Sequence, residues 1–145
     1  MRVLLFFICF LFSSFLCAQD VFPTLRVKEL VSVYDGDTFK VNLFRNQVNH
    51  PLFRENISIR VFGIDTPEIR GNCPQEKELA YKARDLADSV LRAGESIRLR
   101  NPEKDKYFRI LADVYVDDIR LIDILISRGL GVEYYGKGIK KDWCE

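Results

Sequence analysis

The order of apolar and polar positions along the chain predicts five short strands. In chain order these are residues 25–34, 38–44, 57–64, 95–100 and 109–116. Alternation is clearest in the second strand, where Phe39, Val41 and Leu43 fall on one face. In the third strand, Arg60 falls on the face opposite to its apolar neighbours.

The pattern changes to a helical period at residues 74–92. The apolar stripe expected for this helix consists of Leu79, Ala83, Leu86 and Val90. A shorter amphipathic helix is expected at residues 119–129. The order of three strands, a helix, two strands and a helix predicts a β-rich α+β fold. We expect a five-stranded Greek-key barrel of the oligonucleotide-binding (OB) type with two to three helices.

An apolar run at residues 3–17 follows Arg2 and ends beside the small residue Ala18. This layout is typical of a secretory signal peptide, and the run is short for a membrane span. A membrane anchor is the alternative. We expect residues 1–18 to be removed by cleavage after Ala18. That would leave residues 19–145 as one domain, either secreted or periplasmic and free of the membrane.

Removal of the signal peptide leaves two cysteines, Cys73 and Cys144. In an exported chain such a pair is best explained as a disulfide, which would attach the carboxy-terminal tail to the body of the protein. Two free thiols are the alternative.

The overall charge does not indicate a binding partner. The chain has 22 basic and 21 acidic residues, so it lacks the basic excess typical of nucleic-acid-binding proteins. Any site for a polyanion must therefore be local. The one histidine, His50, lies in a polar loop, which argues against histidine triads and histidine-rich zinc sites.

Carboxylates at two predicted strand ends are the most informative candidates for chemistry. They are Asp35, Asp37, Asp65 and Glu68. The Asp-Gly pair by itself favours a tight hairpin turn with positive φ values, and Thr66 could cap a helix that starts at Pro67. Clustered carboxylates without a cation repel one another, so the cluster is either solvated and without function or holds a metal ion. A site made only of oxygen ligands selects calcium or magnesium.

Two arginines extend this candidate site. Arg60 points away from the core face of its strand, and Arg109 lies where the fifth strand begins, after a charged loop. A metal ion and two arginines are suited to stabilising the extra negative charge of a pentacoordinate phosphate.

Three motifs in this order resemble the staphylococcal nuclease (thermonuclease) family: "DGDTFKV", "IRVFGIDTPE" and "DKYFR", with a helix between the last two. The similarity runs from about residue 28 to about residue 135, nearly the whole mature domain. It implies a five-stranded barrel with helices. It also implies calcium-dependent hydrolysis of phosphodiester bonds in DNA and RNA that leaves 3′-phosphate ends, with magnesium or manganese as possible substitutes.

The resemblance also implies roles for single residues. Asp37 and Asp65 are similar to the calcium-ligating carboxylates, with the backbone carbonyl of Thr66 as a further ligand and Asp35 as a supporting acid. Glu68 is similar to the glutamate that activates or positions the attacking water.

The remaining roles concern the substrate. Arg60 and Arg109 are similar to the pair that holds the phosphate and stabilises the transition state. Lys106 and Tyr107 are similar to residues that line the nucleotide site, and Tyr135 is a further aromatic candidate.

Two features depart from the family pattern. Phe108 stands where the family's best-known member has glycine, which could aim Arg109 differently. The chain ends at "KKDWCE", too early for a long carboxy-terminal helix, and the predicted disulfide would fix this shorter end. Closing so long a loop could contribute about 4 kcal/mol of stability.

The sequence therefore favours an exported, metal-dependent nuclease of low sequence specificity. Its substrates would be DNA and RNA, preferably where they are single-stranded, and the protein would be a monomer. A barrel that binds single-stranded nucleic acid without cutting it is the main alternative. A secreted, disulfide-linked module that binds proteins is a weaker one.

Overall fold

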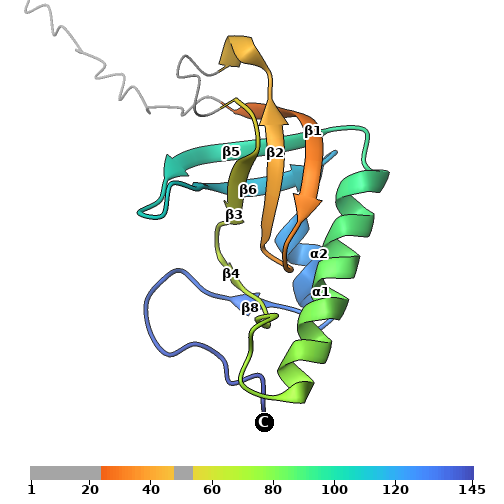
Figure 1. Cartoon of the computed structure of the whole chain (residues 1–145), viewed down its shortest axis with the longest axis vertical. Helices are drawn as coiled ribbons and strands as arrows, with labels where there is room; N and C mark the ends of the chain where they lie inside the picture. The colour runs from red at the N-terminus through yellow and green to blue at the C-terminus, as the bar shows by residue number, and fades with distance from the viewer. Residues whose placement is uncertain (1–23, 48–53) are drawn as a thin grey trace, which may run out of the picture.

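Five strands close into a barrel in the computed structural model of the protein, which describes residues 24–47 and 54–145 (Figure 1). The barrel strands are β1 (Leu25–Val33), β2 (Thr38–Leu43), β3 (Ile57–Val61), β5 (Ile97–Lys104) and β6 (Ile110–Val116). They pair antiparallel in the order β3-β2-β1-β5-β6, and β3 also pairs parallel with β6. This last pairing closes the sheet, so the predicted OB-type barrel is confirmed.

Shorter elements extend the barrel at its ends. They are the 3₁₀ helix η1 (Arg45–Gln47) and the strands β4 (Ile64–Asp65), β7 (Ile119–Arg120) and β8 (Val132–Glu133). β7 continues the sheet beyond β6, and β4 pairs antiparallel with β8 as a separate two-stranded sheet. The β4–β8 pair ties the segment after β3 to the carboxy-terminal part of the chain.

The core of the barrel follows the alternation expected from the sequence. Phe39, Val41 and Leu43 of β2 are all buried, as predicted, and β3 and β6 bury every second residue. Arg60 lies on the outer face of β3, so the strand delivers its guanidinium to the surface of the barrel. Alternation thus separates the residues that fold the barrel from those available for chemistry.

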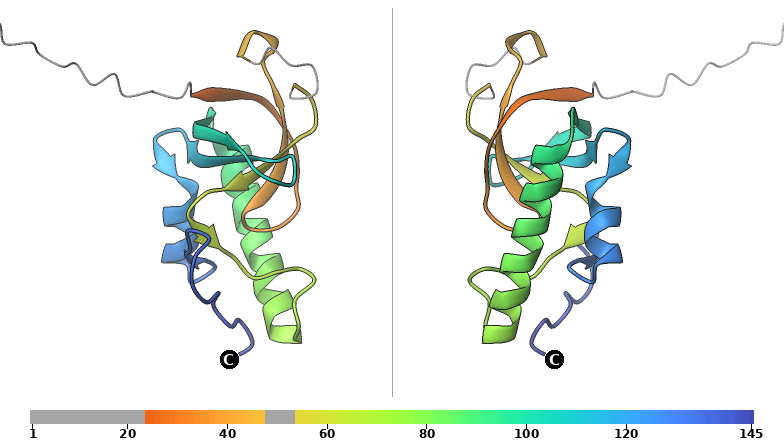
Figure 2. Two further views of the ribbon diagram at one scale, coloured as in Figure 1. Left: turned by 90° about the vertical axis from the view of Figure 1, so that its left-hand side faces the viewer. Right: turned by 90° about the vertical axis from the view of Figure 1, so that its right-hand side faces the viewer.

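Two helices cover the barrel, α1 (Pro74–Ala93) and α2 (Leu121–Ser127) (Figure 2). The stripe predicted for α1 is right at Ala83, but its fully buried neighbours are Ala80, Ala87 and Leu91, whereas Leu86 and Val90 are only partly buried. The helix is therefore rotated relative to the prediction. Small alanine side chains on the buried face allow the helix to approach the sheet closely.

Two predicted elements run across a break in the structure, and the predicted strand 95–100 is found instead at Ile97–Lys104 as β5. A turn at Phe62 and Gly63 divides the predicted strand 57–64 into β3 and β4, and Gly63 has φ 83°. The predicted helix 119–129 starts later, because Ile119 and Arg120 pair with β6 as β7. In both places the apolar pattern of the sequence continues past a point where the backbone changes direction.

The Asp-Gly turn between β1 and β2 differs from the two-residue hairpin that the sequence favoured. Gly36 does not have a positive φ. A Cβ at this position would lie 2.8 Å from Cβ of Ala83 and 3.0 Å from Cγ2 of Thr66. The glycine is needed for close approach to α1 and to the segment after β4, and not for turn geometry.

The carboxy-terminal tail is tied to the start of α1 by a disulfide between Cys73 and Cys144, as predicted. Figure 1 shows the end of the chain and the start of α1 at the same end of the molecule. Cys73 is also the N-cap of α1, and its sulfur accepts a hydrogen bond from the backbone N–H of Glu76. The helix begins at Pro74, as the helical period predicted, so the alternative in which Thr66 caps a helix that starts at Pro67 does not hold.

Some predictions fall on residues that the structure does not describe. The signal peptide of residues 1–18, its cleavage after Ala18 and the loop position of His50 all lie outside the described ranges. Within residues 24–47 and 54–145, neither helix combines the length and the apolar character needed to cross a membrane.

Candidate active site

The turn between β1 and β2 buries two carboxylates in adjacent positions of the site. Oδ1 of Asp35 accepts a 3.1 Å hydrogen bond from the backbone N–H of Asp37, which fixes the Asp35 side chain relative to the backbone of the turn. The carbonyl of Asp37 accepts a 2.8 Å hydrogen bond from the backbone N–H of Val61. The turn is therefore attached to β3 as well as to its own strands.

Asp37 is the centre of a polar network between three elements. Its Oδ2 forms an ion pair with the guanidinium of Arg60 and accepts a 2.9 Å hydrogen bond from the hydroxyl of Thr66. Its Oδ1 accepts a 3.1 Å bond from the hydroxyl of Thr38. A second guanidinium nitrogen of Arg60 donates to the backbone carbonyl of Ile64 at 3.2 Å. These contacts hold both Asp37 and Arg60 in fixed orientations.

The carboxyl group of Asp35 lies in an environment that disfavours its negative charge. Burial raises the pKa of its carboxyl to about 7, and the neighbouring charges of Asp37 and Glu68 contribute to this shift. A cation close to Asp35 would offset this unfavourable environment and stabilise the ionised carboxylate. The influence of Glu68 also places that residue in the same electrostatic neighbourhood.

Asp65 lies at the end of β4 and is only 2% exposed. The ammonium of Lys140 lies 2.7 Å from its Oδ1 as an ion pair, and the indole N–H of Trp143 donates to its Oδ2 at 3.4 Å. Oδ1 is buried, and apart from Lys140 no described residue donates a hydrogen bond to it. The negative charge of Asp65 is therefore compensated by residues of the carboxy-terminal tail.

Glu68 is exposed and lies on the loop between β4 and α1. Its Oε1 is 3.7 Å from Nζ of Lys140. The loop is held by the buried carboxylate of Glu76, which accepts hydrogen bonds from the backbone N–H groups of Glu68 at 3.3 Å and Asn72 at 2.8 Å. A Cβ at Gly71 would lie 2.3 Å from the same carboxylate, so the loop passes directly over it.

Arg109 is positioned by the turn that leads into β6. Asp105 accepts bonds from Nε of Arg109 at 2.7 Å and from the backbone N–H groups of Arg109 at 3.0 Å and Tyr107 at 2.7 Å. Burial acts to raise the pKa of Asp105, but these hydrogen bonds together lower it below 3.8. Asp105 therefore remains ionised and holds Arg109 in place.

Phe108 occupies the left-handed region in this turn, with φ 60°, and is 74% exposed. A glycine adopts this conformation without strain. This is a physical reason for the glycine that the best-known member of the resembling family has at this position. The next residue, Arg109, lines the cleft of the candidate site.

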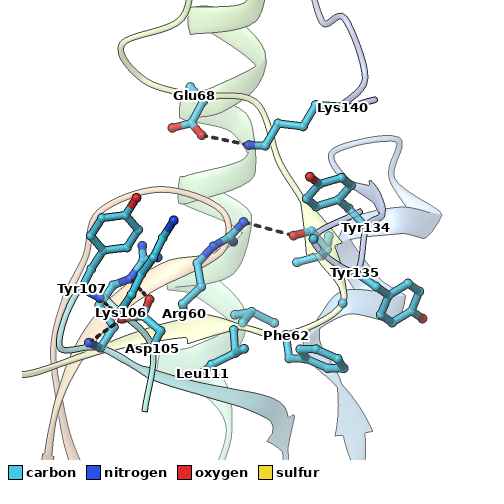
Figure 3. A pocket seen from close by; sticks show the side chains of 15 residues that line it. Arg60, Phe62, Glu68, Asp105, Lys106, Tyr107, Leu111, Tyr134, Tyr135 and Lys140 are labelled. Atoms are coloured by element: carbon cyan, nitrogen blue, oxygen red, sulfur yellow. Dashed lines mark hydrogen bonds and ion pairs between the residues drawn. The ribbon is translucent and has the colours of Figure 1, made fainter. Parts of the chain in front are cut away.

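One cleft of about 630 Å³ joins the exposed members of this site (Figure 3). It is lined by both arginines, Arg60 and Arg109, together with Glu68 and Lys140. Aromatic and basic side chains form its walls: Phe62, Lys106, Tyr107, Tyr134 and Tyr135. Arg60 lies between Tyr107 on one side and the pair Tyr134 and Tyr135 on the other. Such walls suit the bases and phosphates of nucleic acid.

The sequence model described as "Staphylococcal nuclease homologue" matches residues 58–142. The chain belongs to the staphylococcal nuclease family. No curated protein matches the chain in sequence. The matched region contains β3 from its second residue onward, both α-helices, the whole of β5 and β6, and the site residues from Arg60 to Lys140.

Members of the staphylococcal nuclease family are generally hydrolases that bind nucleic acid as substrate and typically need a metal ion. The donors near Asp37 fit a hard cation chemically, because they are all oxygen atoms, and the buried Oδ1 of Asp65 has no partner among the described residues apart from the half-exposed ammonium of Lys140. The carboxylates do not converge tightly, however. Within the described part of the chain, the only trio of Cys, His, Asp or Glu side chains with ligand atoms mutually within 4.8 Å is Cys73, Glu76 and Cys144, and the disulfide between the two cysteines leaves them no thiolate for a metal.

The structure brings most of the predicted site residues of this nuclease homologue together. Arg60, Glu68, Lys106, Tyr107, Arg109 and Tyr135 line one cleft. Asp37 and Thr66 contact each other directly, and Asp35 and Asp65 are buried beside them. The predicted cluster of carboxylates is divided, since Asp37 pairs with Arg60, whereas Asp65 and Glu68 pair with Lys140.

Several residues of the site escaped the sequence analysis. They are Phe62, Asp105, Tyr134, Lys140 and Trp143 on the cleft or its carboxylates, and Glu76 beneath the loop. One signal was available, because the predicted disulfide already tied the tail to the loop after Glu68. Which tail residue contacts the carboxylates depends on the path of the tail. The tail has no periodic structure, so no local sequence pattern predicts that this residue is Lys140.

Proposed function

We propose that the protein is an exported, metal-dependent nuclease that hydrolyses phosphodiester bonds of DNA and RNA with low sequence specificity. Cleavage would leave 3′-phosphate ends. Calcium is the proposed cation, with magnesium or manganese as substitutes, and the protein would act as a monomer in the periplasm or outside the cell. Single-stranded or transiently opened regions would be preferred, because the cleft walls carry aromatic side chains that suit unpaired bases.

One observation carries this proposal. A single cleft presents two guanidinium groups and a carboxylate, those of Arg60, Arg109 and Glu68, next to buried aspartates. Guanidinium groups bind phosphate oxygens with two parallel hydrogen bonds. A carboxylate beside a phosphate site would be unfavourable for binding alone, but it is useful for activating water.

Arg60 and Arg109 would hold the phosphate and offset the charge that develops at phosphorus. Arg60 keeps a fixed direction through Asp37 and the carbonyl of Ile64, and Arg109 through Asp105. Because both are oriented before substrate arrives, little rearrangement is needed as the charge develops.

Glu68 would accept the proton of the attacking water. The water oxygen forms a bond to phosphorus, the bond from phosphorus to the 5′ oxygen breaks, and that oxygen leaves as a hydroxyl after taking up a proton. The 3′ oxygen keeps the phosphate, which accounts for the proposed ends. The exposed position of Glu68 at the cleft gives water access to its carboxylate.

Asp37 and Asp65, with the backbone carbonyl of Thr66 and support from Asp35, would hold the cation. A bound cation would polarise the phosphate and add positive charge near the reacting oxygen atoms. Burial of the aspartates, which are close to the cleft but away from bulk water, strengthens their electrostatic influence on a bound phosphate.

A module that binds single-stranded nucleic acid without cutting it is the second candidate. The observation that favours it is the aromatic wall formed by Phe62, Tyr107, Tyr134 and Tyr135 around a basic cleft. A module of this kind would work in the presence of a chelator, whereas the proposed nuclease would stop.

The deciding experiment uses purified residues 19–145 with the disulfide formed. The protein is incubated with heat-denatured DNA, with calcium or with excess chelator, and acid-soluble nucleotides are measured over time. Release in calcium that ceases in chelator supports the nuclease. Retention of intact DNA by folded protein, equally in calcium and chelator, supports the binding module and contradicts hydrolysis.

A further inference from the structure

The tail of residues 134–145 leads from β8 back to the start of α1 and passes the buried carboxylates of the site (Figure 1). It contributes an ammonium group at Lys140 and an indole at Trp143. Neither residue belongs to a motif that carried the family resemblance. Both contact Asp65, which lies 78 residues before Trp143 in the chain.

Lys140 bridges two carboxylates of the site. Its Nζ lies 2.7 Å from Oδ1 of Asp65 and 3.7 Å from Oε1 of Glu68, and Figure 3 shows it extended along the cleft toward Glu68. The pKa of the ammonium is raised by the hydrogen bond and charge of Asp65 and by the charge of Glu68. The side chain is still 49% exposed, so it can leave these partners for solvent without a large change in packing.

The tail is anchored on the carboxy-terminal side of Lys140. Cys144 is bonded to Cys73, the side chain of Trp143 is buried at 6% exposure, and Gln75 donates a 3.3 Å hydrogen bond to the terminal residue Glu145. β8 fixes the other end through its pairing with β4. Lys140 is therefore held near Asp65 at a high effective concentration, whether or not the ion pair is formed.

An ammonium group and a divalent cation compete for one carboxylate oxygen. Asp65 is buried, so its charge requires a counter-charge, and the described residues offer Lys140 at that oxygen. A cation placed on the same oxygen would also be repelled by an ammonium that remained in contact.

We propose that Lys140 is a built-in counter-ion of Asp65 and Glu68, and that a divalent cation must displace it to bind. Lys140 thus sets the cation affinity of the site, and the anchored tail keeps it available as a competitor. Displacement also frees the carboxylate of Glu68 at the moment when the cation arrives. The inference rests on the proposed function, because it requires a divalent cation at Asp65.

The first arm of the test measures calcium binding by calorimetry, without nucleic acid. Lys140→Met keeps much of the side-chain volume and removes the charge. The matched control is Lys137→Met, because Lys137 is an exposed lysine of the same tail that forms no ion pair with any described carboxylate. We expect Lys140→Met to bind calcium about fivefold more tightly than the wild type, the effect of one partly exposed ion pair. Lys137→Met should remain close to the wild type.

The second arm follows the ammonium group itself in the wild-type protein. Reductive methylation at low conversion, read residue by residue by mass spectrometry, reports how accessible each lysine is. We expect methylation of Lys140 to speed up when calcium saturates the site, whereas methylation of Lys137 stays constant. A charge that only repels the cation from a fixed position would change the affinity but not this rate.

The outcomes separate the inference from the proposed function. Unchanged methylation of Lys140 in saturating calcium, or equal calcium affinity of the wild type and Lys140→Met, overturns the inference and leaves the nuclease proposal intact.

Calcium binding by Lys140→Met but not by the wild type supports the inference, because Lys140 would then exclude the cation completely. Absence of binding by both proteins overturns the inference together with the proposed cation. Displacement of Lys140 by calcium in a protein that does not cleave DNA supports the inference alone. If Lys140→Met does not fold, methylation of the wild type decides.

Discussion

The hydroxyl of Thr66 donates a 2.9 Å hydrogen bond to Oδ2 of Asp37, across 29 residues of sequence. This bond joins the β1–β2 turn to the segment that follows β4, and both segments contribute proposed cation ligands. The close approach of Gly36 to Thr66 serves the same junction. This contact between buried side chains therefore joins the two halves of the proposed cation site, together with the bridge that Arg60 makes from Asp37 to the carbonyl of Ile64.

Replacing Thr66 by valine tests this junction. Valine has nearly the same shape but no hydroxyl, so a buried oxygen of Asp37 loses one donor, at an expected cost of about 1–2 kcal/mol in the free energy of unfolding. Urea denaturation measures the loss. Thr66→Ser keeps the hydroxyl and serves as the control, and equal stability of the valine and serine variants would contradict the role of the bond.

Replacing Glu68 by glutamine tests the proposed activation of water. The amide keeps the size of the side chain but cannot accept the proton, so turnover should fall by about 10²- to 10⁴-fold with little change in substrate binding. Steady-state kinetics on single-stranded DNA separate kcat from KM. Glu78→Gln, on the exposed side of α1, is the control. Equal losses of turnover and binding in Glu68→Gln would argue against a role in the chemical step.

The left-handed conformation of Phe108 predicts an inverted order of stability between two substitutions. At most positions glycine is less stable than alanine, because it loses more backbone freedom on folding. At φ 60° alanine keeps the strain of about 1–2 kcal/mol, whereas glycine relieves it. Phe108→Gly should therefore be more stable than Phe108→Ala in thermal unfolding. Both variants lose the contact between Lys104 and the Phe108 ring, so the comparison is matched. The usual order, with alanine more stable, would mean that the turn is not strained.

Asp105 predicts a specific dependence of stability on pH. Its pKa is lowered below 3.8 in the folded protein, so its charge stabilises the fold above pH 3.8, and this contribution is lost as the pH falls through the folded pKa. Asp105→Asn should be less stable than the wild type at pH 7, and the difference should shrink in acid. Chemical denaturation at several pH values measures it. A difference that persists unchanged at pH 3 would point to lost geometry and not to lost charge.

The disulfide between Cys73 and Cys144 closes a loop with a sequence separation of 71. Replacing both cysteines by serine should lower the free energy of unfolding by about 4 kcal/mol, mainly because the unfolded chain gains freedom. The double variant can be compared with wild-type protein under reducing conditions, which should behave alike. Stability equal to that of the oxidised wild type would show that the tail is held by its other contacts.

The sequence predicted the site better than it predicted the surroundings of the site. The three motifs identified Arg60, Glu68 and Arg109, and the structure gathers them in one cleft. Motifs of this kind are readable because a strand end or a tight turn fixes the direction of its side chains locally. The roles proposed for these residues remain predictions, because a shared cleft does not by itself measure catalysis.

Partners from distant segments were not predictable in the same way. Glu76 is buried under the Glu68 loop, although a glutamate in the first turn of a helix is ordinarily solvated. Its environment arises from the loop that folds back over it and from the disulfide beside it. Gly36 gave a misleading signal for the same reason, since the glycine is required by the approach of α1 and not by its own turn.

The sequence by itself determined the barrel strands, the two helices and the cysteine pair of this protein. Alternation along a strand and the period of a helix are local properties, and Cys73 and Cys144 are the two cysteines that the predicted removal of residues 1–18 leaves. Tertiary structure decided which face of α1 is buried, how the carboxylates divide between Arg60 and Lys140, and that the tail reaches Asp65. These depend on barrel closure and on the path of the tail, where contacts join residues that no local pattern relates.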